Sequence, residues 1–242
     1  MQNGIRNFIV QKHFRICLHL CKRYKHTVVL DEMFNETNKF HVQTKLQTSH
    51  PLLRPDSQKY KAKRPAAVLV PMCYVNGEPS LLFMMRSQHL NNHRGEVCFP
   101  GGMQDPSDKD TVHTALRETH EEIGMSQDQV DVWGNLSGSP TSRTGNWVTP
   151  VLGFCGEIDI SQLKLNHREV EEVFTRSISS LCHPPSIRST QWRYPGSQGY
   201  TLPVYLGGKP GHRIWGLTAV IVHQVLTIIA PGLYTFKLRH HR

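Results

Sequence analysis

The sequence predicts an α/β protein, an α/β/α sandwich around a mixed β-sheet. Short stretches rich in Val, Leu and Ile, typical of strands, lie on both sides of a helical stretch at residues 110–123. A second, more apolar helical stretch follows at 214–229. Strands that alternate with helices bury their apolar side chains when the helices cover the faces of one sheet. A domain of roughly 170 residues is long enough to bury a complete core.

Turn residues bound the expected elements. Asn76-Gly77-Glu78-Pro79 separates the first two strands, and a Gly-rich turn follows the third. Gly124 predicts the end of the first helix, because glycine readily takes the left-handed conformation of a C-terminal cap. The polar segment 137–146 is expected to be a loop. We expect strands at 66–75, 81–86, 97–99, 130–136, 148–158, 170–174 and 200–206, and helices at 110–123, 178–181 and 214–229.

The most informative segment, residues 99–125, reads FPGGMQDPSDKDTVHTALRETHEEIGM. Glu118, Glu121 and Glu122 stand at positions i, i+3 and i+4, which places them on one helix face. Three acids on a helix alone more often form a solvated surface. Here they follow a Gly-rich turn, and hard divalent cations take such oxygen ligands and bridge to substrate phosphates. The pattern therefore predicts a Mg²⁺ or Mn²⁺ site that acts on a phosphate ester.

This segment resembles the signature of the Nudix hydrolases, G-x5-E-x7-R-E-U-x-E-E-x-G-U, where U is an aliphatic or similar residue. The second half of the signature is matched in full by Arg117, Glu118, Thr119, Glu121, Glu122, Gly124 and Met125. The first half departs from it, because Asp108 stands where the family has Glu and eight residues separate it from Arg117. The resemblance implies the Nudix fold and metal-dependent hydrolysis of a diphosphate bond.

The region upstream is similar to the coenzyme A diphosphatase branch of that family, whose pattern is L-L-T-x-R-S-x3-R-x3-G-x3-F-P-G-G. The matching residues are Leu82, Arg86, Ser87, Gly95 and the run Phe99-Pro100-Gly101-Gly102, whereas Phe83, Met84 and Asn91 depart. This likeness implies cleavage of CoA or acyl-CoA to adenosine 3′,5′-bisphosphate and (acyl-)phosphopantetheine. The departures keep ADP-ribose, NADH and other nucleoside diphosphate derivatives open as substrates. A catalytically silent Nudix-fold binding module is the alternative outside the enzyme class.

The resemblance assigns roles to individual side chains. Glu118 and Glu122 are the expected principal metal ligands, with Glu121 as a third or water-mediated ligand, and these three are the expected catalytic residues. The general base stays open between Glu121 and Glu169. We expect Arg117 to brace the loop through Asp108 or Asp105. The expected substrate-binding residues are Arg86, Arg94, Gly101 and Gly102, since guanidinium groups match phosphate and glycines allow close backbone approach.

Charge divides the chain into two parts. Residues 1–65 hold 13 Lys and Arg against four acids, a net of +9, and the whole chain also nets +9, so residues 66–242 are balanced. Residues 1–30 are basic, contain no acid and intersperse Phe and Leu, as mitochondrial transit segments do. We therefore expect a transit segment at 1–30, a weakly helical lead-in or linker at 31–61 and a Nudix domain at 62–235. A balanced domain gives no reason to expect nucleic acid as a partner.

Other features of the sequence indicate the compartment and the partners of the protein. The six cysteines include no C-x-x-C pair, which fits a reducing compartment. The longest apolar stretch, Leu217 to Ala230, is too short to span a bilayer. The expected partner is a small-molecule substrate, CoA or acyl-CoA. The oligomeric state stays open between monomer and homodimer.

Overall fold

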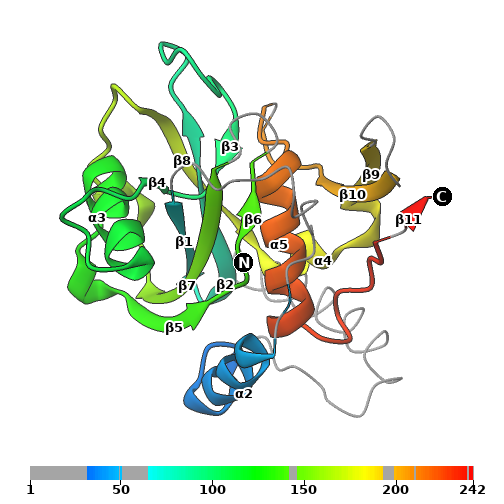
Figure 1. The fold of residues 1–242 in the computed structure, drawn as a ribbon. Coiled ribbons are helices and arrows are strands. Elements are labelled where there is room, and N and C mark those ends of the chain that lie inside the picture. Colours follow the sequence, from blue (N-terminus) through cyan, green and yellow to red (C-terminus); the bar gives the residue numbers. More distant parts are fainter. Residues whose placement is uncertain are drawn as a thin grey trace, which may run out of the picture.

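The computed structural model describes residues 32–48, 50, 65–141, 146–192, 199–209, 211–238 and 240–241. Its centre is an eight-stranded sheet with helices on both faces (Figure 1). The strands of this sheet are β1 (Pro65–Val75), β2 (Glu78–Arg86), β3 (Val97–Cys98), β4 (Gly101–Met103), β5 (Asp131–Asn135), β6 (Ser139–Pro140), β7 (Trp147–Glu157) and β8 (Val170–Ser177). The predicted transit segment lies outside the described residues.

The sheet is mixed, as the sequence predicts. Its main path runs β3-β2-β1-β7-β5, with β4 paired to β1, β6 to β7 and β8 to β2. β1 and β7 are parallel, and the other pairs are antiparallel. β1 is buried along most of its length because it lies at the centre of the path.

Two helices cover opposite faces of the sheet. α3 (Thr111–Ile123) packs over a cluster that includes Ala67, Leu69 and Val151, and α5 (Gly216–Ile229) packs over a second cluster around Phe83 and Leu152. Figure 1 shows α3 on one side of the sheet and α5 on the other. The predicted α/β/α sandwich is confirmed. The short helix α4 (Ile178–Cys182) follows β8 directly.

Several short elements were not predicted. β4 occupies the predicted Gly-rich turn, and β6 lies inside the segment expected to be a loop. Beyond α5, a small second sheet forms from β9 (Ile187–Trp192), β10 (Gly199–Tyr205) and β11 (His240–His241), of which only β10 was expected. β4, β6 and β11 have only two or three residues, too few to show an alternation of apolar and polar side chains.

Part of the segment expected to be a weakly helical lead-in or linker packs into the core. α2 (Glu36–Gln47) packs against β5 and α5, and Lys39 Nζ lies 2.7 Å from Asp131 Oδ2. Before the helix, Met33 and Phe34 are 2% and 6% exposed within the α5-side core. This part of residues 31–61 is a helical lead-in that packs on the domain, which is one of the two readings that the sequence leaves open. The apolar pair Met33-Phe34 is the feature of the sequence that indicates this contact with the core.

None of the helices in the described part of the chain is long and apolar enough to cross a membrane.

Candidate active site

Helix α3 is fixed at both ends by its own sequence. Asp110 caps the N-terminus, where its Oδ1 accepts the backbone N–H of His113 at 2.8 Å. Gly124 caps the C-terminus with φ of 72°, a left-handed conformation that favours glycine. Ala115, Thr119 and Ile123 lie on the buried face. Glu122 lies on the same face, so the helix carries a carboxylate into the protein.

Glu122 is 2% exposed and lies beside the Gly-rich turn. Its Oε2 accepts the backbone N–H of Gly101 at 2.8 Å, and its Oε1 lies 3.7 Å from Nη1 of Arg86. Burial raises the pKa of this carboxyl to about 8, against the opposing effects of the Gly101 N–H and Arg86. Because Gly101 and Arg86 offset only part of the cost of burying this charge, the Glu122 carboxylate is suited to bind a cation.

Glu118 lies one turn earlier on α3 and faces the same strand. A Cβ on Gly102 would stand 2.5 Å from the Glu118 carboxyl carbon, so only glycine leaves room for this carboxylate. The neighbouring Gly101 has φ of 145°, and a Cβ there would lie 2.3 Å from the carbonyl oxygen of Ala67. Burial raises the pKa of Glu118 above its usual value. The two glycines thus form a cradle for the carboxylates of α3.

Arg117 braces the loop before α3, as predicted, and it does so through Asp108. Its Nε and Nη2 donate to the two oxygens of Asp108 at 2.9 and 2.8 Å, and Nη2 also reaches the Met103 carbonyl at 3.2 Å. The Arg117 guanidinium holds the pKa of Asp108 well below its usual range. Asp105, the other predicted partner, instead donates its backbone N–H to Asp108 Oδ2 at 2.9 Å.

Glu121 differs from the other two glutamates of the helix. Its side chain is 54% exposed, and its Oε2 lies 3.2 Å from Nη1 of Arg117. In the described part of the chain, no three His, Cys, Asp or Glu side chains gather closely enough to hold a metal ion as they stand. Glu118 also lies 3.1 Å from Arg117, but the structure brings Glu118 and Glu122 to the cradle and leaves Glu121 exposed. The set of three ligands stays a prediction.

The two predicted substrate-binding arginines differ in setting. Arg86 ends β2, and its Nε is buried without a hydrogen-bond partner among the described residues. An unsatisfied buried donor is costly unless an acceptor arrives, so Arg86 is suited to an anionic substrate. Arg94 is exposed and lines a polar hollow formed by the loop at residues 88–96.

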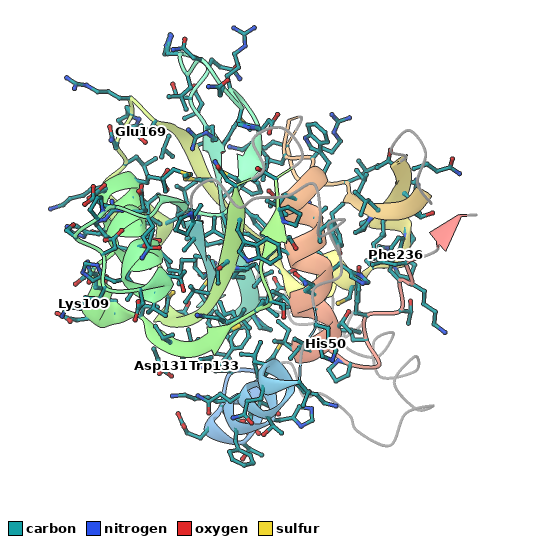
Figure 2. The ribbon with its side chains drawn as sticks, in the orientation of Figure 1. His50, Lys109, Asp131, Trp133, Glu169 and Phe236 are labelled. Atoms are coloured by element: carbon teal, nitrogen blue, oxygen red, sulfur yellow. The ribbon has the colours of Figure 1, made fainter. Side chains whose placement is uncertain are left out.

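Glu169, an open candidate for the general base, lies close to the site. It precedes β8, and Figure 2 shows it at the upper edge of the sheet, on the α3 side. Its backbone carbonyl accepts the Ser87 N–H at 2.8 Å, next to Arg86. Its charge contributes to the raised pKa of both Glu118 and Glu122. Glu169 thus lies near the carboxylates of α3, and its role as the base stays a prediction.

Two contacts of the site were not foreseen. His113 Nδ1 lies 2.9 Å from Asp108 Oδ1, which adds a third side chain to the brace. The Gly101 N–H bond to Glu122 is the other. His113 stands three residues after the N-cap, and no local pattern ties it to Asp108. Both contacts depend on the path of the loop rather than on spacing along the helix.

Comparison with known proteins identifies the class to which this fold and site belong. The NUDIX domain model matches residues 63–194. The chain therefore belongs to the Nudix family, as the sequence signature predicts, and the class is that of the Nudix hydrolases.

Among curated relatives, a mouse protein named mitochondrial coenzyme A diphosphatase NUDT8 is 46% identical over 170 residues, 70% of this chain and 80% of the mouse protein. The human protein of the same name is 46% identical over 176 residues, 72% of each chain. Nudix hydrolase 3 of Caenorhabditis elegans is 38% identical over 205 residues, 79% of this chain and 82% of the worm protein.

Proposed function

We propose that this protein hydrolyses the diphosphate bond of coenzyme A and acyl-CoA, with adenosine 3′,5′-bisphosphate and (acyl-)phosphopantetheine as products. The observation that carries the proposal is the 46% identity to two proteins named as mitochondrial coenzyme A diphosphatases. The site supports it, because Arg86 offers an unsatisfied buried donor next to the carboxylates of α3.

The donors around the cradle fit Mg²⁺ or Mn²⁺, which prefer carboxylate oxygens. Glu118 and Glu122 would hold the metal, with Glu121 as a third or water-mediated ligand. When bound, a divalent ion supplies Lewis-acid stabilisation of the diphosphate and lowers the pKa of a coordinated water.

The other side chains of the site would orient the substrate and neutralise the charge of its phosphates. Arg86 is suited to donate to the diphosphate, because its guanidinium lies 3.7 Å from Glu122 and has a free N–H. Arg94, on the exposed loop, is suited to bind a phosphate group of the substrate. Gly101 and Gly102 let the backbone approach the phosphates closely. Glu121 and Glu169 both remain candidates for the base that takes the proton from the attacking water.

A substrate panel tests this proposal. The purified full-length protein is incubated with CoA, dephospho-CoA, ADP-ribose and NADH, with Mg²⁺ or Mn²⁺, and the products are identified by mass. We expect adenosine 3′,5′-bisphosphate to form fastest, from CoA. AMP formed from ADP-ribose or NADH with CoA intact would contradict the CoA assignment and retain Nudix chemistry. Absence of turnover with every substrate would favour a binding module.

We also infer that the protein acts in mitochondria. The basic, acid-free character of residues 1–30 and the mitochondrial names of two relatives support this location. A fluorescent reporter fused to residues 1–35 should enter mitochondria. A diffuse cytosolic signal would contradict the inference.

A further inference from the structure

We propose that Arg213 and Trp215 form the subsite for the adenosine 3′-phosphate end of the substrate. The inference rests on the proposed function and adds a place for the part of CoA that does not react. The indole of Trp215 would stack on the adenine, and the guanidinium of Arg213 would meet the 3′-phosphate.

Both side chains point outward from an extended segment. Tyr205, the last residue of β10, and Ile214 exchange backbone hydrogen bonds of 2.9 and 3.0 Å, which form an isolated antiparallel bridge. His212 and Ile214 are buried, whereas Arg213 and Trp215 alternate with them and are exposed. Trp215 is 41% exposed. Among the described residues, Phe40 and Leu206 are the only other large apolar side chains that are exposed.

The two side chains already stack on each other. The Arg213 Cζ lies 5.6 Å from the centre of the Trp215 ring, a cation–π contact. Among the described residues, Arg213 forms no ion pair with an acid. An exposed aromatic face with an adjacent unpaired cation has the chemistry that binds a purine next to a phosphate.

The pair lies near the strands that carry Arg86. Thr218, one helical turn after Trp215, donates its hydroxyl to the Val97 carbonyl at 3.0 Å. Val97 is paired with Met85, the residue before Arg86. The first turn of α5 is thus fastened to the strand pair at the edge of the active site.

Charge at the start of α5 favours a phosphate group. The first turn of this helix contains no acid, and no side chain caps its N–H groups. These N–H groups form the positive end of the helix dipole. Arg213 therefore lies in surroundings that favour an anion over a neutral hydroxyl. This predicts a preference for a 3′-phosphorylated ribose.

Direct binding tests the subsite without turnover. Isothermal titration of the full-length protein with adenosine 3′,5′-bisphosphate and with AMP compares Trp215→Ala, Trp215→Phe and Arg213→Gln with the unaltered protein. Trp215→Ala should weaken both ligands about tenfold, the value of one stacked base. Trp215→Phe should retain most of the affinity. Arg213→Gln should weaken only adenosine 3′,5′-bisphosphate, about tenfold, and so remove its advantage over AMP.

Two control variants make the same kinds of substitution at residues outside the proposed subsite. Phe40→Ala removes another exposed aromatic side chain, on α2, and Arg188→Gln removes another arginine, on β9. Both should bind like the unaltered protein. Unaltered affinities in Trp215→Ala and Arg213→Gln, or equal weakening in the controls, would overturn the subsite.

The binding assay separates this inference from the proposed function. If CoA is hydrolysed and Trp215→Ala raises KM about tenfold with kcat nearly constant, both stand. If CoA is hydrolysed and the variants have unaltered KM and affinity, the subsite is wrong and the function stands. If adenosine 3′,5′-bisphosphate binds through Trp215 but CoA is not cleaved, the function is wrong and the subsite stands.

Discussion

Arg117 holds the loop before α3 by donating to several groups at once. Asp108, with a side chain that is fully buried, receives two of its hydrogen bonds, and Glu118 and Glu121 lie within 3.2 Å of its guanidinium. A planar guanidinium suits this paired recognition better than an ammonium. The position of the carboxylates on α3 therefore depends on a residue that is not expected to touch the substrate.

Replacing Asp108 with Asn should destabilise the protein. The amide keeps one acceptor but loses the second and the charge, which leaves a guanidinium N–H poorly satisfied at a cost of about 2 kcal/mol. Urea unfolding of Asp108→Asn measures this difference. Asp105→Asn is the control, since Asp105 contacts the brace through its backbone N–H. Equal stability of Asp108→Asn and the unaltered protein would argue against the brace.

At the residue scale, the sequence predicts what repeats along the helix and misses what depends on the loop. The spacing of Glu118 and Glu122 places both at the cradle. The i, i+4 spacing of Arg117 and Glu121 also accounts for their contact at 3.2 Å. It does not show that Glu121 is exposed while Glu118 and Glu122 lie at the cradle, because that depends on the path of the Gly-rich segment. The approach of Glu169 depends on pairing of distant strands, which no local pattern records.

At the scale of elements, β4 and α3 act together. β4 pairs with β1 through Ala66, Ala67 and Val68, so the glycines of the strand are held against the sheet. The carboxylates of α3 contact the same glycines: Glu122 accepts the Gly101 N–H, and Glu118 lies against Gly102. A strand of three residues was hidden within the predicted turn, because glycine gives no apolar signal and its pairing partner is more than 30 residues away.

Gly102→Ala should lower activity with little change in stability. The added Cβ lies 2.5 Å from the Glu118 carboxyl carbon, so the carboxylate must turn away from the cradle. We expect kcat to fall at least about tenfold and the free energy of unfolding to change by less than about 1 kcal/mol. Gly156→Ala adds a Cβ in open space but at a φ of 71°, which strains alanine, so this control should lose stability and keep its kcat. Unchanged kcat in Gly102→Ala would contradict this role of the strand.

At the scale of the whole molecule, the core extends beyond the region matched by the family model. Residues 33–47 lie before that region, and α5 lies after it, yet both join the cluster on one face of the sheet. Periodicity along the chain predicted α5, whereas α2 has few apolar residues and carries one buried side chain, Val42. Helices with so little apolar periodicity are hard to distinguish from a linker.

Phe34→Ala should destabilise the whole domain. The Phe34 ring lies 5.3 Å from that of Tyr74 and 5.4 Å from that of Phe154, and the residue is 6% exposed. Loss of a buried phenyl group costs about 3–5 kcal/mol. Thermal and urea unfolding measure it, with Phe40→Ala, 74% exposed, as the control. A loss below about 1 kcal/mol in Phe34→Ala would mean that this segment is not part of the core.

A buried histidine should make the fold sensitive to acid. His223 on α5 is 8% exposed, and its Nδ1 lies 2.9 Å from the Tyr234 hydroxyl, which lies 2.6 Å from the Tyr205 hydroxyl. Burial lowers the pKa of His223 to about 4, from an ordinary value of 6.5. Between these values the unfolded chain binds the proton and the folded one does not. Stability contributed by neutral His223 is thus present above pH 6.5 and is lost as the pH falls toward 4.

Protonation of His223 should lower the free energy of unfolding by about 3 kcal/mol between pH 7 and pH 4. His223→Asn should lose less stability over this range than the unaltered protein, because asparagine does not titrate. Urea unfolding at several pH values measures the difference, with the exposed His167→Gln as the control. Parallel pH profiles for His223→Asn and the unaltered protein would refute this assignment.

The central claim is that Glu118 and Glu122 hold a divalent metal at the glycine cradle, and Mn²⁺ binding tests it most directly. Electron paramagnetic resonance titrates Mn²⁺ into the full-length protein and into Glu118→Gln, Glu122→Gln and Glu121→Gln, beside an exposed control, Asp128→Asn. We predict that Glu118→Gln and Glu122→Gln weaken binding at least about tenfold and abolish most hydrolysis, with a smaller effect for Glu121→Gln. Mn²⁺ affinity in Glu122→Gln equal to that of the control would contradict the account.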